Sequence, residues 1–176
     1  PEAGAGVAAG RQARRDEVDV VDGGLVALGL AAVGDDAEVV QARDLLDLAD
    51  TKAPGVPVVL VFDEPGLVGG LRPEVPLGAD GVIDLLSGAL AAVEGRALTG
   101  VHCCGPTDWR LLLQAGPQLL SLPVGADVTG SAGALGAFLE RGGWVAWGAV
   151  ATNEPLGEQP SRSWRQLSAQ WCELVQ

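Results

Sequence analysis

Runs of apolar residues alternate with amphipathic stretches along most of this chain. From Val56 onward, continuous runs of β-branched residues and leucine indicate strands, and apolar residues spaced three or four apart indicate helices. Strands are expected at 56–62, 98–104, 119–124 and 144–151. Helices are expected at 83–93, after N-caps at Thr107 and Ser131, and after Ser161. The helix after Ser131 is expected to bury Leu135, Phe138 and Leu139.

The chain before Val56 is less regular. Residues 1–17 show no clear period and predict a loose arm or a poorly packed helix. Residues 18–33 alternate weakly and indicate a strand. Asp35 and Asp36 offer an N-cap for a helix that ends before Pro54. The apolar side of this helix is expected to consist of Val39, Ala42, Leu45, Leu46 and Ala49.

The order of these elements predicts an α/β protein built from parallel (β/α) units. We expect one domain over 1–176, with a poorly defined part at 1–34 and the recognisable units at 56–176. A closed eight-stranded barrel takes about 250 residues, with about 200 as a lower bound. The chain has 176 residues, so it is a partial or truncated TIM-type barrel, an open sheet, or part of a larger whole.

Composition argues against several classes of function. The formal net charge is −12 and no basic stripe is present, so we expect no nucleic-acid partner. The longest apolar region, 25–33, is too short for a bilayer span of about 20 residues, so we expect no membrane association. Three cysteines, two of them adjacent, do not form a disulfide framework, which favours a reducing, cytoplasmic location. Because residue 1 is proline, we expect a fragment or a processed product.

Candidate chemistry gathers where the expected strands end. Asp63 and Glu64 follow the strand at 56–62, and His102 and Cys104 lie at the end of the next. The carboxyl ends of parallel strands share one edge of a sheet, and sites of α/β proteins form there. The later strand ends add Ser121, Pro123, Asp127, Thr152, Asn153 and Glu154.

His102 is the single histidine of the chain. If the strand continues through residue 104, His102 and Cys104 share a face and Cys103 points the other way. Imidazole and thiolate suit zinc, so we expect His102 and Cys104 to be metal ligands. Two other interpretations stay open: a hydrogen-bonded histidine with a small buried thiol, and Asp63-Glu64 as a turn or helix cap. Cys172 is interpreted as structural.

Several of these segments resemble one known family. The segment 58–67, Val-Val-Leu-Val-Phe-Asp-Glu-Pro-Gly-Leu, resembles the Asp-Glu-Pro strand of the cobalamin-independent methionine synthases, and 101–106, Val-His-Cys-Cys-Gly-Pro, resembles their His-x-Cys zinc strand. The segments 111–122 and 144–150 follow in the same order and spacing. The likeness covers about 56–175 and is closest to the shorter, single-barrel members.

The resemblance implies a TIM-type barrel in which zinc activates a thiol for methyl transfer. Carried over to this chain, it makes His102 and Cys104 zinc ligands, and Asp63, with Glu64 beside it, the binding site for the amino group of a homocysteine-like substrate. Zinc lowers the pKa of a bound thiol, so the thiolate persists at neutral pH.

The chain also departs from the family pattern. Pro123 stands where the family has a ligating glutamate, and Asp127 is out of register with that position. Cys172 does not match the family's second cysteine, and Gly69 replaces its folate-side glutamate. The chain also lacks the histidine that donates a proton in the family.

These departures leave two hypotheses. The first is a zinc-dependent methyltransferase of this family acting on a small-molecule thiol. The second is a non-catalytic relative that serves as a binding or structural subunit. A half barrel would expose sheet edges and an apolar face, so we expect a homo- or hetero-oligomer in either case.

Overall fold

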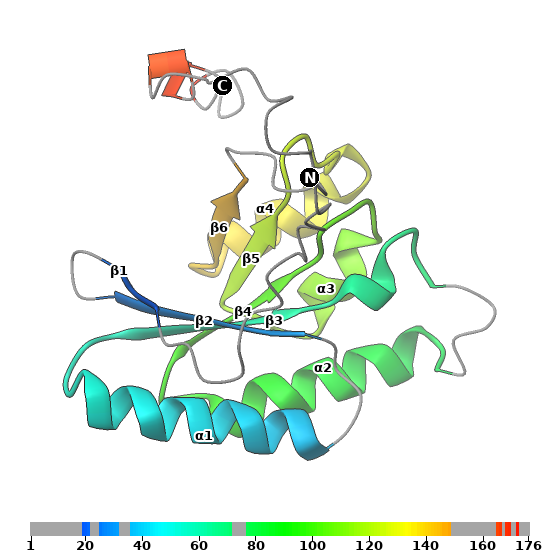
Figure 1. Ribbon diagram of the computed structural model, residues 1–176. Helices are drawn as coiled ribbons and strands as arrows, with labels where there is room; N and C mark the ends of the chain where they lie inside the picture. The colour runs from blue at the N-terminus through cyan, green and yellow to red at the C-terminus, as the bar shows by residue number, and fades with distance from the viewer. Residues whose placement is uncertain are drawn as a thin grey trace, which may run out of the picture.

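The computed structural model describes residues 19–21, 25–31, 36–71 and 77–148, together with Arg165, Gln166, Ser168, Ala169 and Cys172. The elements are β1 (Asp19–Val21), β2 (Leu25–Ala31), α1 (Asp36–Lys52), β3 (Val58–Asp63), the 3-10 turn η1 (Pro65–Leu67), α2 (Ala79–Val93), β4 (Leu98–His102), α3 (Trp109–Gln114), β5 (Leu119–Leu122), the 3-10 turn η2 (Thr129–Ser131), α4 (Ala132–Glu140) and β6 (Trp144–Trp147) (Figure 1).

The described strands form one sheet in the order β1-β2-β3-β4-β5-β6. Strand β1 is antiparallel to β2, and each following neighbour pairs in parallel, from β2 to β6. This confirms the predicted α/β class, with parallel strands alternating with helices. Within the described residues the sheet is open, with β1 and β6 at its two edges.

The helices form one layer on one side of this sheet. Successive right-handed crossovers that advance in the same direction place every helix on the same face. In agreement, α1 contacts α2, α2 contacts α3, and α3 contacts α4. Figure 1 shows α1 and α2 side by side along the sheet. The described part of the chain therefore has a helix-covered face and a helix-free face.

The hydrophobic core lies between the helices and the sheet. Along β3, Val58, Leu60 and Phe62 are buried, while Val59 and Val61 are half-buried. This alternation is expected when only one face of a strand is fully covered. The most deeply buried large side chains of the core are Phe62, Leu46, Leu60, Leu86, Leu112, Leu120, Leu122, Val93 and Val101.

Register aligns the residues of the helix-free face. Val61 of β3 pairs with Gly100 of β4, and Gly100 pairs with Leu119 of β5. A Cβ atom at Gly100 would lie 2.9 Å from Cδ2 of Leu119, so the missing side chain lets the leucine lean over β4. On the edge strand β6, Trp144 is 65% exposed. The middle of this face is therefore apolar.

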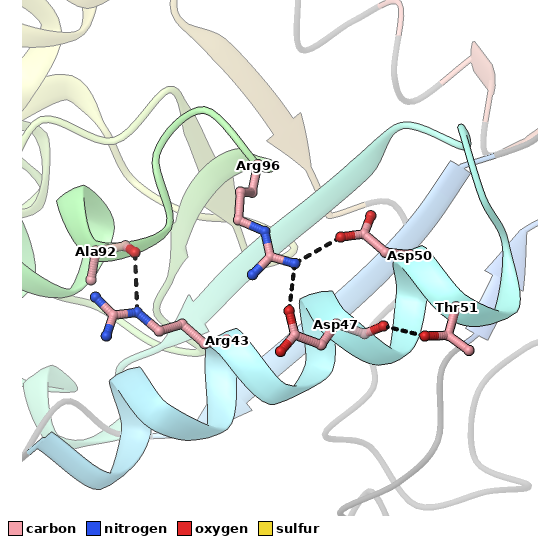
Figure 2. A network of polar contacts seen from close by, with 6 residues as sticks. All are labelled: Arg43, Asp47, Asp50, Thr51, Ala92 and Arg96. Atoms are coloured by element: carbon pink, nitrogen blue, oxygen red, sulfur yellow. Dashed lines mark hydrogen bonds and ion pairs between the residues drawn. The ribbon is translucent and has the colours of Figure 1, made fainter.

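An exposed ionic network joins α1 to the segment between α2 and β4 (Figure 2). The Nη2 atom of Arg96 donates to Asp47 Oδ1 at 2.8 Å and to Asp50 Oδ2 at 2.7 Å. Beside it, Arg43 Nε donates to the carbonyl oxygen of Ala92 at 3.4 Å. Because exposed ion pairs contribute little to stability, we expect this network to add little to the free energy of unfolding.

Most predicted elements are present, with shifted ends. The weak alternation at 18–33 corresponds to two strands, β1 and β2, rather than one. Helix α1 ends at Lys52, before Pro54 as expected, and α2 begins at Ala79, earlier than predicted. The expected arm at 1–17 lies outside the described residues. So does most of the expected C-terminal helix after Ser161.

Two helix predictions were wrong in detail. The cap of α3 is Asp108 rather than Thr107, since the Asp108 side chain accepts the N–H of Arg110. Leu139 was expected inside α4, but it is 48% exposed. Its neighbour Phe138 is buried, and adjacent helical residues project about 100° apart, so both cannot face the core. None of the described helices combines the length and apolar character needed to span a bilayer.

Candidate functional site

Three polar side chains stand in a row across the ends of three neighbouring strands. Asp63 of β3 is the register partner of His102 of β4, and His102 is the register partner of Ser121 of β5. Register partners in a sheet share a face, so all three lie on the helix-free side. We call Asp63, His102 and Ser121 the polar row. It brings together two of the residues predicted from sequence, Asp63 and His102, as expected for carboxyl ends of parallel strands.

Asp63 contributes an unpartnered acceptor to the polar row. Its Oδ1 atom is buried and has no hydrogen-bond partner in the described part of the chain. A buried polar atom without a partner costs about 1–3 kcal/mol. Such an atom in a native fold needs a reason, and a bound ligand is one. An ammonium group, an N–H donor or a metal ion would satisfy this carboxylate.

His102 is half-buried, and one of its two ring nitrogens is engaged. The Nδ1 atom lies 3.0 Å from Ser121 Oγ and 3.1 Å from the Ser121 carbonyl oxygen. Among the described residues, Nε2 has no hydrogen-bond partner. The imidazole is therefore fixed through one nitrogen to β5, with the other nitrogen left for a ligand or a proton.

Glu64 lies where β3 leaves the sheet. Its backbone N–H donates to the His102 carbonyl oxygen at 2.8 Å, which extends the β3–β4 pairing by one bond. The residue is only 6% exposed. The following turn begins at Pro65 without a side-chain cap from Glu64. Glu64 is nevertheless the N-cap residue of this turn, so the interpretation of Asp63-Glu64 as a turn or cap agrees with the structure in position, without a capping hydrogen bond from the side chain.

The two adjacent cysteines have opposite environments. Cys103 is fully buried in the core, whereas Cys104 is exposed. Burial raises the pKa of the Cys103 thiol, and hydrogen bonds with the Gly105 backbone and the Thr107 side chain oppose this. The prediction that Cys103 faces away from His102 agrees with its place in the core. Strand β4 ends at His102, so strand alternation does not place Cys104, and its sharing a face with His102 stays a prediction.

A cavity of about 480 Å³ opens between the loops that follow β3, β4 and β5. This is a common size for a small-molecule site. None of Asp63, Glu64, His102 and Cys104 lines it. Its lining residues are Gly69, Gly70, Pro106, Thr107, Asp108, Trp109, Arg110, Asp127, Gly130 and Ser131.

The charged side chains around this cavity, Asp108, Arg110 and Asp127, already have hydrogen-bond partners. The Arg110 side chain donates to Asp108 and lowers the pKa of that carboxyl. Thr129 donates its hydroxyl and its N–H to Asp127, which lowers the pKa of Asp127. The Oδ1 atom of Asp127 is therefore engaged by Thr129, and Asp127 is not part of the polar row. We regard the polar row as the stronger candidate site because it holds the unpartnered acceptor.

The residues predicted as ligands do not form a complete metal centre. Within the described ranges, no group of three or more His, Cys, Asp or Glu side chains is placed to hold a metal ion. Pro123 has no side-chain donor for a metal. Thr152, Asn153 and Glu154 lie outside the described residues. The contact of Ser121 with His102 is the feature that sequence reasoning missed, although Ser121 itself was noted at its strand end.

Comparison of the chain with protein-family models, with curated proteins and with solved structures finds no match. The chemistry of the polar row is therefore inferred from the atoms of Asp63, His102 and Ser121 alone. Asp63 offers a buried carboxylate oxygen to a cation or a donor. His102, the register partner of Asp63, offers Nε2. Both lie at the carboxyl ends of their strands, where parallel α/β proteins bind their ligands.

Proposed function

We propose that this chain is a partial TIM-type barrel of the cobalamin-independent methionine synthase kind, which supports methyl transfer to a homocysteine-like thiol. The observation that carries the proposal is the pairing of Asp63 with His102 at the strand ends, with Asp63 Oδ1 buried and unpartnered in the described chain. The sequential order of the parallel strands and the single helix layer support it, because a (β/α) barrel is built in this way.

In this proposal, the chain's own residues bind and orient the substrate. The Asp63 carboxylate accepts hydrogen bonds from the substrate amino group, and Glu64 lies next to it at the end of β3. An ammonium group would satisfy the Asp63 oxygen, which has no partner among the described residues. Anchoring the amino group there fixes the distance from the thiol of a short amino acid to His102.

His102 and Cys104 fit zinc as two of its ligands. Their donor atoms are a ring nitrogen and an exposed thiol, both of which zinc prefers. When bound, such a metal would lower the pKa of the substrate thiol and so keep it as the thiolate, the form that can accept a methyl group. Zinc is usually four-coordinate, so two further positions are left for the substrate, for water or for another polypeptide.

A second candidate function is that of a non-catalytic relative, a binding or structural subunit. Two observations favour it. In the resemblance to the methionine synthases, Pro123 stands where the family has a ligating glutamate, and the described residues contain no complete metal-binding group. Both candidates call for association with another chain, because strands β1 and β6 are sheet edges in the described residues. A compact monomer on gel filtration would count against that association.

Metal analysis distinguishes the two candidates. We expect protein purified without chelator to hold zinc in stoichiometric amount, and the Cys104→Ser variant to lose it. The matched control is Cys172→Ser, which removes another exposed thiol and should keep the metal. A folded wild-type protein without zinc, unaffected by Cys104→Ser, supports the non-catalytic subunit instead.

A further inference from the structure

The sheet places two oxygen atoms of one residue against the same nitrogen of His102. Ser121 Oγ lies 3.0 Å from Nδ1, and the Ser121 carbonyl oxygen lies 3.1 Å from it. A carbonyl oxygen can only accept a hydrogen bond. The contact with the carbonyl is therefore a hydrogen bond only if Nδ1 carries the proton.

We propose that Ser121 is a positioning residue that holds neutral His102 in the Nδ1–H tautomer and thereby leaves the lone pair on Nε2. In neutral imidazole one nitrogen donates and the other accepts, so fixing the proton on Nδ1 decides the role of Nε2. Metal-ligating histidines are oriented in this way, by a hydrogen bond from the nitrogen that does not bind the metal.

The register of the sheet sets this arrangement. His102 and Ser121 are direct partners across β4 and β5, so the carbonyl and the hydroxyl reach the ring without a loop between them. The hydroxyl adds a second acceptor for the Nδ1 proton, and its own hydrogen is free to turn elsewhere. Removing the hydroxyl leaves the carbonyl in place, so its loss should weaken the preference rather than reverse it.

The opposite tautomer would give a different chemistry. If the Ser121 hydroxyl donated to a bare Nδ1, the proton would sit on Nε2, which would have to release that proton before it bound a metal. His102 would instead be placed as a base beside a serine hydroxyl, an arrangement found at nucleophilic serines. The carbonyl oxygen at 3.1 Å argues against this, because two lone pairs would face each other.

The tautomer can be measured directly because His102 is the single histidine of the chain. We would record long-range proton–nitrogen NMR spectra of the full chain, labelled with ¹⁵N and stripped of metal. The pH would be well above about 6.5, the usual pKa of a histidine side chain in model peptides. The expected result is a protonated Nδ1 and an unprotonated Nε2. A protonated Nε2, or rapid averaging of the two forms, would overturn the inference.

A pair of variants tests the role of the hydroxyl, and its consequence for zinc depends on the proposed function. We expect Ser121→Ala to weaken zinc binding about tenfold, the lower end of the range for outer-shell partners of metal ligands. Ser121→Thr keeps a hydroxyl on a strand residue and should restore the affinity. Equal affinity and an unchanged NMR spectrum in Ser121→Ala would contradict the role of the side chain.

The same experiments separate this inference from the proposed function. A wild-type protein with the Nδ1–H tautomer but no affinity for zinc would support the inference and refute the metal site. Zinc binding by a protein whose metal-free form carries its proton on Nε2 would support the metal site and refute the inference. The wild-type spectrum does not depend on whether either Ser121 variant folds.

Discussion

Asp63 and His102 are far apart in the chain but stand side by side at the ends of β3 and β4, on the face of the sheet that the described helices leave free. One brings a buried carboxylate oxygen without a hydrogen-bond partner in the described residues, and the other brings a ring whose Nδ1 is held by Ser121. This arrangement favours a ligand over a purely structural role, because a fold gains nothing from an unpaired buried acceptor.

Removing the charge of Asp63 should stabilise the ligand-free protein. Oδ1 is buried without a partner in the described chain, so we expect Asp63→Asn to raise the free energy of unfolding by about 1 kcal/mol. The same change should abolish binding of an amino-acid substrate. Urea denaturation measures the first effect. The control, Asp84→Asn on the exposed side of α2, should change little. A clear loss of stability in Asp63→Asn would show that its carboxylate has a structural partner.

The two adjacent cysteines should react at very different rates. Cys103 is fully buried and its pKa is raised mainly by that burial, so its thiol stays protonated and covered at neutral pH. Cys104 is exposed. In a Cys172→Ser background we expect iodoacetamide to alkylate one thiol in the native protein, and peptide mass spectrometry to locate it at Cys104. The second thiol should react only on unfolding.

The direction of the Cys103 shift also predicts an effect of alkaline pH. Since the folded-state pKa lies above the unfolded one, the stability that this thiol contributes is complete below the unfolded value, about 8.5, and is lost as pH rises toward the folded value. Alkylation of Cys103 in the native protein as fast as Cys104 would contradict its burial in the core.

Substitution by alanine should have opposite effects on stability at two of the glycines. A Cβ at Gly148, just after β6, would lie 2.6 Å from the Val124 nitrogen and 2.9 Å from the Leu122 oxygen, both backbone atoms. We expect Gly148→Ala to lower the free energy of unfolding by about 1–3 kcal/mol. Gly88 lies inside α2 with nothing within 4 Å of its Cβ position. Gly88→Ala should therefore stabilise by about 0.4–1 kcal/mol.

Thermal denaturation of both glycine variants is the measurement. Both substitutions add the same methyl group. If they change the free energy of unfolding in opposite directions, the difference comes from the surroundings of each glycine. Destabilisation by Gly88→Ala, or a neutral Gly148→Ala, would contradict the packing described around β5 and β6.

The cap of α3 should make the protein sensitive to acid. Arg110 lowers the pKa of Asp108 through a side-chain hydrogen bond, so the stability from this carboxylate is present above its usual pKa, about 3.9, and is lost as pH falls through the lowered value. Asp108→Ala should cost about 0.5–2 kcal/mol at neutral pH through loss of the cap. Asp108→Asn keeps an acceptor for the Arg110 N–H and should cost less.

Melting curves at neutral pH and at a pH below the lowered pKa of Asp108 would test the role of this carboxylate. The gap between the wild type and Asp108→Asn should narrow in acid, because both side chains are then uncharged. A gap that stays constant down to the lowest pH would mean that the Asp108 charge contributes nothing to the fold.

The parallel sheet was predictable from sequence because its strands coincide with apolar runs that are visible in the sequence. The β-branched run before Asp63 and the apolar run before His102 each fill a strand that is covered on one face and half-covered on the other. Their succession with helices gave the strand order, and hence the meeting of Asp63 with His102. The contact between His102 and Ser121 was not predictable, since it depends on the register of β4 against β5, which short apolar runs do not specify.

The errors in the helices have local causes. Thr107 and Asp108 are both good caps, and the sequence does not say that the Thr107 side chain is engaged by the Cys103 thiol instead. Phe138 and Leu139 are adjacent apolar residues, of which a single helix face can bury only one. The expected pairing of His102 with Cys104 assumed that the strand continues, whereas β4 ends at His102.

Zinc content is the measurement that tests the central claim most directly. We predict one zinc ion for each wild-type chain purified without chelator, and its loss in His102→Ala, which removes the chain's single imidazole. Far-UV circular dichroism would verify that the variant is folded. A folded wild-type protein without zinc, or a His102→Ala variant that retains it, would contradict the account.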